Sequence, residues 1–74
     1  MAMDEARQLV ASALERAVEE VACDGALGEV AGWDSLGHMH IVLKLESALG
    51  RTLRPDEILS LTSVADVAAL LARH

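Results

Sequence analysis

Apolar side chains recur at helical spacing through the first part of the chain. Between Asp4 and Ala22 they stand at Ala6, Leu9, Val10, Ala13, Leu14, Ala17, Val18 and Val21. Steps of three and four residues place such side chains on one face of a helix, as a single buried stripe. Asp4 and Glu5 fall at the start, where the helix macrodipole favours negative charge. The pattern predicts a first helix from Asp4 to Ala22.

Three glycines interrupt this periodicity across residues 23–33 and predict a long connection. They are Gly25, Gly28 and Gly32. We expect Leu27 and Val30 to anchor the connection in the core, and Cys23, near the end of the first helix, to be a small packed residue. Loops of this length are uncommon inside compact domains and are often functional.

A second helix is predicted from Ser35 to Leu49, with Asp34 as its N-cap and Gly50 as its C-terminal stop. Two apolar stripes run along it. One consists of Ile41, Leu45 and Leu49 with Val42, and the other of Leu36, Met39 and Leu43. The two stripes point well apart, and a helix that is apolar on two faces is either buried all round or offers one face to a partner.

Two further helices complete the predicted fold. Pro55 favours a short helical turn through Leu59. Ser63 and Asp66 resemble a capping box for a last helix, whose buried stripe is Val64, Val67, Ala68, Leu70 and Leu71. We therefore predict an all-α fold, a small four-helix bundle of three longer helices and one short one, as a single domain over residues 1–74.

Composition agrees with a helical fold and restricts the function. The chain has 74 residues, no Phe or Tyr and one Trp. A chain of this size buries only about 60% of its unfolded surface, which leaves little room for a deep substrate pocket, so an autonomous enzyme is not expected.

A lone cysteine allows no intramolecular disulfide or zinc set and indicates a reducing compartment. Without an apolar run of membrane-spanning length or a signal-like start, we expect a cytoplasmic protein with no membrane partner.

The charge balance argues against nucleic acid as a partner. Twelve acidic and six basic residues give a net charge of −6. The basic residues are spread along the chain, whereas binding to phosphates needs a clustered basic face. The last helix carries Arg73 as its only cation, which argues against DNA reading by a helix-turn-helix. A basic protein surface is the more natural partner.

The candidate chemistry lies in the run from Gly32 to Met39, where Ser35 follows the capping Asp34. A hydroxyl at a helix start is exposed and stands beside unpaired N–H groups, so a phosphate on it would lie where the dipole favours negative charge. Asp and Ser are also common at this position for capping alone, so both residues could serve only as the helix cap. A serine hydrolase is excluded, because Trp33 occupies the position of the first glycine of a nucleophile elbow.

Two histidines follow the serine on the same helix. His38 and His40 lie about 200° apart on a helix and cannot chelate one metal ion. We expect both side chains to be solvated or to face a partner, and we predict no metal site.

Asp34-Ser35-Leu36, behind a glycine-containing loop and an amphipathic helix, resembles the acyl carrier protein family. The resemblance extends over nearly the whole chain, through Leu45-Glu46, Pro55-Asp56-Glu57 and Ser63-Val64-Ala65-Asp66. It implies that Ser35 receives 4′-phosphopantetheine from coenzyme A, in a reaction performed by a separate phosphopantetheinyl transferase with magnesium. Acyl or aminoacyl cargo would then be carried as a thioester by a monomeric protein that itself catalyses nothing.

The resemblance also implies a docking surface on the serine's helix. Leu36, Met39 and Leu43 would form its apolar part and Glu46 an acidic contact, although ordinary core residues would have the same spacing. The implied partners are the transferase, an acyl- or aminoacyl-loading enzyme, and ketosynthase or condensation-type enzymes.

Several positions differ from the family pattern. His38, His40 and Lys44 occupy a helix that is strongly acidic in many fatty-acid carriers, which favours a polyketide or hybrid peptide pathway over a fatty-acid type. Trp33 replaces the commoner small or aliphatic residue, and we interpret its indole as packing over the loop. The alternative function is an unmodified small acidic helical adaptor that binds a protein partner and does not need the Ser35 hydroxyl.

Overall fold

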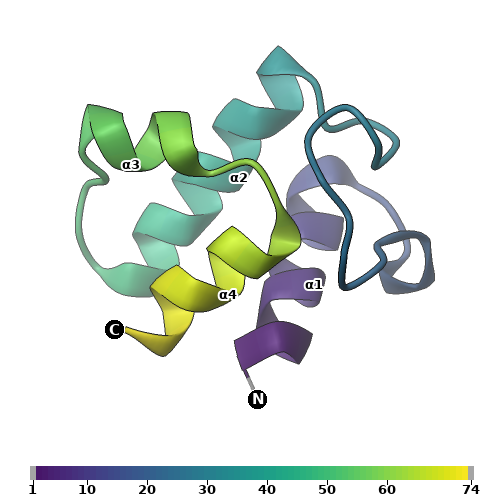
Figure 1. Ribbon diagram of the computed structural model, residues 1–74, viewed down its shortest axis with the longest axis horizontal. Coiled ribbons are helices and arrows are strands. Elements are labelled where there is room, and N and C mark those ends of the chain that lie inside the picture. The colour runs from purple at the N-terminus through teal and green to yellow at the C-terminus, as the bar shows by residue number, and fades with distance from the viewer. Residues whose placement is uncertain (1, 74) are drawn as a thin grey trace.

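The computed structural model describes residues 2–73, and within them the chain forms four α-helices, one short 3-10 helix and no β-strand (Figure 1). The elements are α1 (Ala2–Leu14), the 3-10 helix η1 (Val18–Glu20), α2 (Ser35–Leu49), α3 (Pro55–Ser60) and α4 (Val64–Ala72). Three longer helices and one short one confirm the predicted all-α bundle. Across the described residues, no helix has both the length and the apolar character that a membrane span needs.

Helices α1, α2 and α4 enclose the hydrophobic core, with α1 packed against both of the others. On α2 the core face is the predicted stripe, in which Ile41 and Leu45 are fully buried and Val42 and Leu49 nearly so. Burial of this apolar surface is the main force that holds so short a chain together. The prediction that this stripe of α2 faces the core is therefore confirmed.

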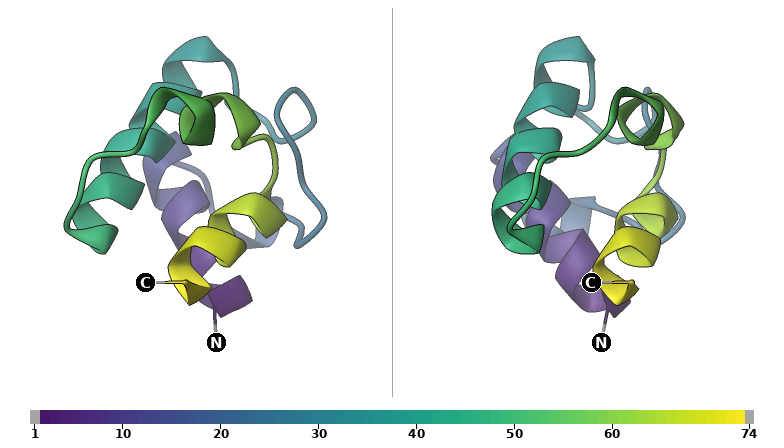
Figure 2. Two further views of the ribbon diagram at one scale, coloured as in Figure 1. Left: turned by 60° about the vertical axis from the view of Figure 1, so that its left-hand side comes forward. Right: turned by 90° about the vertical axis from the view of Figure 1, so that its left-hand side faces the viewer.

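The bundle has two distinct ends. The start of α1 and the end of α4 lie close together at one end (Figure 1). The first turn of α2 lies at the opposite end, beside the long loop that precedes it, and the rotated views show the same arrangement (Figure 2).

The first helix is shorter than the sequence predicts, because it ends at Leu14 and not at Ala22. Glu15 adopts a left-handed backbone conformation with φ of 56°, and this conformation stops the helix. The N–H of Arg16 then returns to the carbonyl of Ala11 at 2.9 Å, in the manner of a helix C-terminus.

Backbone groups beyond this point are satisfied by a side chain of α1. The Arg7 guanidinium donates to the carbonyl of Val21 at 2.7 Å and to that of Val18 at 3.0 Å. Buried backbone carbonyls need such partners where no helix provides them. Val21 is fully buried, so it reaches the core from irregular backbone although its spacing continues the pattern of α1.

The long loop is anchored differently from its prediction. Val30 is buried as expected, but the Leu27 side chain is 44% exposed and Cys23 is exposed, so both of those predictions are wrong. The backbone does the anchoring instead, since the Leu27 N–H donates to the carbonyl of Thr62 at 2.8 Å. A backbone pair of this kind leaves the side chain free to point outward.

The caps of the later helices follow the sequence with one exception. Gly50 ends α2 in the left-handed conformation, with φ of 71°. The Ser63 hydroxyl accepts from the N–H of Asp66 at 3.2 Å, as predicted. The exception is that the Asp66 carboxylate also accepts from the N–H of Thr62, at 2.9 Å, which the sequence did not predict.

Helix α3 begins at Pro55 as predicted and is fixed to the end of α2 by Glu57, whose side chain is only 9% exposed. The Arg51 guanidinium donates to both carboxylate oxygens, at 3.0 and 2.9 Å, and the N–H of Arg54 donates at 2.9 Å. These hydrogen bonds, first those of Arg51, lower the pKa of the Glu57 carboxyl from 4.5 to about 2. The folded state therefore favours the ionised carboxylate.

We expect stability to depend on the charge of Glu57. Its contribution is complete above the unfolded pKa of 4.5 and is lost as the pH falls toward the folded pKa of about 2. Urea unfolding at a series of pH values should show a free energy of unfolding that falls over this window. Glu57→Gln should flatten the fall, whereas Asp56→Asn should not, because the Asp56 side chain is 73% exposed. A Glu57→Gln curve parallel to that of the wild type would contradict the assignment.

Candidate functional site

Ser35 is the first residue of α2 and is exposed, at the end of the bundle remote from the start of α1 and the end of α4 (Figures 1 and 2). Asp34 precedes it as the N-cap, and its carboxylate accepts from the N–H of Gly37 at 2.9 Å. The Asp34 carbonyl accepts from the N–H of His38 at 2.7 Å, which continues the helical pattern. Because the cap is provided by Asp34, the Ser35 hydroxyl is not needed for it.

The electrostatics at this position suit a phosphate. The first N–H groups of a helix have no intrahelical partners and carry the positive end of the macrodipole. A phosphodiester on Ser35 would lie beside this end, on the solvent side of the chain. An exposed serine hydroxyl at a helix N-terminus therefore fits covalent attachment of a phosphate-bearing group.

The loop before Ser35 packs unusually close to α2. A Cβ on Gly37 would overlap the backbone carbonyl oxygen of Gly32 and would stand 2.7 Å from Cδ2 of Leu14. Side chains other than hydrogen do not fit at this point, because the obstacle is backbone. Gly37 is a site residue that the sequence analysis missed; a glycine inside a helix, where it costs stability, is the signal of close backbone approach.

Trp33 fixes the loop from the inside. Its side chain is 2% exposed, which confirms the packing interpretation. The indole N–H donates to Nδ1 of His38 at 3.1 Å, and the two rings stack with centroids 6.4 Å apart. His38 is half-buried and its Nε2 lies 3.1 Å from the carbonyl oxygen of Ile58, so the expectation of a solvated or partner-facing His38 is wrong. His40 is exposed as expected.

An apolar stripe crosses the exposed face of α2 near Ser35. Leu36 is 67% exposed, Met39 49% and Leu43 58%, so these residues are not core. Glu46, the predicted acidic contact, is half-buried, and one of its oxygens accepts from the N–H of Leu53 at 2.8 Å. Part of the Glu46 carboxylate is thus used within the fold.

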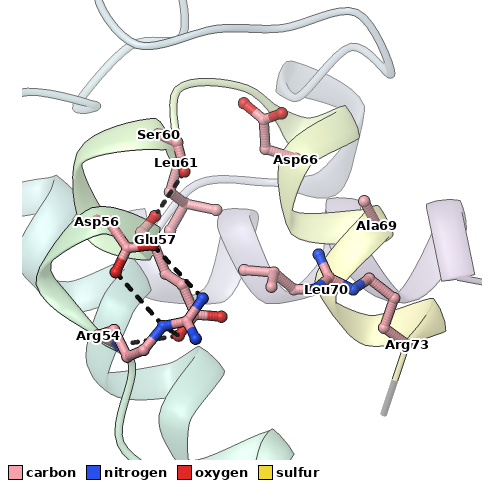
Figure 3. Close-up of a pocket in the computed structure, with 9 residues that line it drawn as sticks. All are labelled: Arg54, Asp56, Glu57, Ser60, Leu61, Asp66, Ala69, Leu70 and Arg73. Atoms are coloured by element: carbon pink, nitrogen blue, oxygen red, sulfur yellow. Dashed lines mark hydrogen bonds and ion pairs between the residues drawn. The ribbon is translucent and has the colours of Figure 1, made fainter.

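A polar hollow of about 260 Å³ lies between α3 and α4 (Figure 3), and Ser35 does not line it. Arg54, on its α3 side, is paired with Asp56 at 3.3 Å and lies 3.7 Å from Glu57. Its positive charge is therefore engaged within the fold. Residues 2–73 also contain no group of three His, Cys, Asp or Glu side chains placed to hold a metal ion.

The family model described as "Phosphopantetheine attachment site" matches residues 4–71, a range that includes Ser35 and every helix from the first turn of α1 to the last turn of α4. This chain belongs to the phosphopantetheine-attachment family. A comparison with curated proteins gives no match to it. The resemblance to acyl carrier proteins is confirmed, and the fold is the helical bundle that it implied.

Membership makes the protein a carrier domain. Domains of this family carry covalently attached 4′-phosphopantetheine, and they are generally non-catalytic partners of biosynthetic enzymes. The residues fit such a group. The exposed Ser35 hydroxyl stands at a helix N-terminus, and the cap hydrogen bond is accepted by Asp34 instead of by this hydroxyl. When bound, phosphopantetheine supplies a thiol for thioesters at the end of a long flexible arm. The protein then provides the surface that partner enzymes recognise.

Proposed function

We propose that this protein is an acyl carrier protein modified on Ser35, which takes acyl or aminoacyl thioesters between enzymes of a polyketide, hybrid peptide or fatty-acid type pathway. The observation that supports this most is the exposed Ser35 hydroxyl at the first position of α2, inside the matched range. The whole chain, residues 1–74, would act as one carrier domain.

In the loading reaction, the chain contributes the nucleophilic oxygen and its setting. The Ser35 oxygen forms a phosphoester bond as the pyrophosphate bond of coenzyme A breaks, the nucleotide portion leaves, and the hydroxyl proton passes to the transferase. Asp34 holds the first turn of α2 through the N–H of Gly37. The remaining free N–H groups of that turn then favour the phosphate of the product.

Intact-mass measurement tests the proposal. The protein is incubated with coenzyme A, magnesium and a broad-specificity phosphopantetheinyl transferase, and tandem fragmentation locates the added group. We expect one phosphopantetheinyl group, on Ser35. No mass gain with several transferases, or a gain at another residue, would refute it.

We further propose that the apolar stripe of Leu36, Met39 and Leu43, with Glu46 at its far end, is the docking surface for the transferase and for later enzymes. Exposed apolar side chains gathered beside a functional residue are typical of interfaces. Lys44 and His40 are exposed on the same helix, which sets this surface apart from a strongly acidic one and supports a specialised pathway.

Leu36→Asp tests the docking surface. Truncating or charging a central contact commonly costs more than 1 kcal/mol of binding, so kcat/KM for loading should fall about tenfold. Leu59→Asp is a matched control, because Leu59 is 81% exposed but lies on α3 outside the stripe. Both variants should keep the wild-type circular dichroism spectrum. Equal losses in the two variants would contradict a docking surface confined to the stripe.

A further inference from the structure

A chain of side-chain contacts links the loop before Ser35 to α3 through His38. The Trp33 indole N–H donates to Nδ1 of His38 at 3.1 Å on one side. On the other side, Nε2 of the same ring lies 3.1 Å from the carbonyl oxygen of Ile58, near the end of α3. His38 itself sits in the first turn of α2, three positions after Ser35.

These partners determine the protonation of the ring. An indole nitrogen can only donate and a backbone carbonyl can only accept. Nδ1 must therefore hold a lone pair toward Trp33, and Nε2 must carry the proton that is donated to Ile58. Both bonds exist together only when His38 is neutral with its proton on Nε2, since a proton on Nδ1 would face the indole N–H.

The link joins two segments outside the three longer helices. Each has one further tie described above: Glu57 holds α3 to the end of α2, and the Leu27 N–H holds the loop to Thr62. α3 has six residues, and its Leu59 side chain is 81% exposed. The loop on the other side contains no helix between η1 and α2 and relies on Trp33 and Val30 as buried side chains. Short, loop-flanked segments are the parts of a fold that open most easily, so a side chain that bonds to both of them stabilises their closed forms together.

We propose that His38 is a positioning residue of the carrier site, which in its neutral Nε2–H form ties the Trp33 loop and α3 to the first turn of α2. This link keeps the backbone around Ser35 in the arrangement that a transferase recognises. Loss of either bond lowers the population of that arrangement and with it the apparent affinity of the transferase. The predicted effect on loading rests on the proposed function, in which Ser35 is the attachment residue. The Trp33–His38–Ile58 contacts do not depend on that proposal.

The first test is spectroscopic and uses the unmodified chain. In a ¹⁵N-labelled sample at pH 8, we expect a scalar coupling between Trp33 Nε1 and His38 Nδ1 across the hydrogen bond. The ring proton should be found on Nε2 of His38. A proton on Nδ1, or no coupling, would overturn the proposal.

Two variants separate the two bonds. A glutamine amide can occupy the place of Nε2, so His38→Gln keeps a donor for Ile58 and loses the acceptor for Trp33; His38→Asn does the reverse. We expect hydrogen exchange of α3 amides to quicken in His38→Asn and to stay near the wild-type rate in His38→Gln. Similar exchange in both variants and the wild type would contradict the tie to α3.

Loading kinetics give the functional readout, at a temperature where every variant is folded. Each His38 variant should raise KM and lower kcat/KM roughly 3- to 10-fold, as expected for one lost hydrogen bond. Trp33→Phe should change kcat/KM as much as His38→Gln does. The double variant Trp33→Phe/His38→Gln should have a kcat/KM no lower than that of either single variant, because all three lack the hydrogen bond from Trp33 to His38. Ser47→Ala, at an exposed residue near the other end of the same helix, is the control and should load normally.

The outcomes separate this inference from the proposed function. If the wild type is loaded on Ser35 and both His38 variants are loaded at the wild-type rate, His38 does not position the site. If the wild type is not loaded, the proposed function fails, and the nitrogen coupling and the α3 exchange still decide whether the link exists.

Discussion

Ser35→Ala should abolish loading completely while leaving the fold intact. The variant lacks the hydroxyl oxygen that we propose forms the phosphoester, so no phosphopantetheinyl group should appear by intact mass even after long incubation. Stability should change by less than about 0.5 kcal/mol, since the side chain is exposed and surface substitutions of this kind have small effects. The helix keeps its cap, because Asp34 and not Ser35 accepts from Gly37.

Ser47→Ala is the matched control, because Ser47 is an exposed serine near the other end of the same helix. It should load like the wild type. If Ser35→Ala still gained the group, another residue would be the attachment point. If the wild type were never modified and Ser35→Ala retained full binding to its partner, the unmodified adaptor would be the better description.

Gly37→Ala should destabilise the protein strongly, although alanine is the better helix former. Helix propensity alone would make the variant more stable by about 1 kcal/mol. The new methyl group, however, would overlap the carbonyl oxygen of Gly32 and press on Leu14. Overpacking of this kind typically costs about 1 to 3 kcal/mol, which for a domain of this size is a fall in Tm of roughly 5 to 20 °C. Differential scanning calorimetry would measure it.

Gly28→Ala separates steric overlap from backbone conformation. Gly28 has a φ of 87° but nothing near its missing Cβ, so its variant should lose only about 1 kcal/mol through conformational strain. Gly37→Ala should be the more harmful change and should also slow loading, because the loop that it displaces adjoins Ser35. A Gly37→Ala variant with a higher Tm than the wild type would show that the Gly32 carbonyl does not lie against the Cβ position of Gly37.

The sequence predicts best the elements whose determinants are local. Helix α2 begins after Asp34 and ends at Gly50 as predicted, because a capping carboxylate and a left-handed glycine act within a few residues. The sequence also predicts that Leu36 and its companions point away from the core stripe, since the angle between two stripes on one helix is fixed by geometry. Their exposure comes from the structure, because a helix that is buried all round would have the same pattern. Ser35 stands where the local pattern puts it.

Features that depend on distant contacts could not be predicted. Val21 has the spacing of α1 but enters the core from a loop, where the Arg7 side chain donates to its carbonyl. His38 and Glu46 look like surface residues by periodicity, yet each bonds to backbone from a later part of the chain. Periodicity reports which face of a helix is apolar; it carries no information on which polar side chains the rest of the fold will use.

The first turn of α2 lies opposite the start of α1 and the end of α4 (Figures 1 and 2), and this placement has a practical use. The start of α1 and the end of α4 adjoin each other at the far side of the bundle from the first turn of α2 (Figures 1 and 2). A tag, a bead or a fused enzyme attached beyond the start of α1 or the end of α4 would leave Ser35 facing away from its support. Immobilised preparations of this protein should therefore stay open to visiting enzymes, and capture experiments can be built on either terminus.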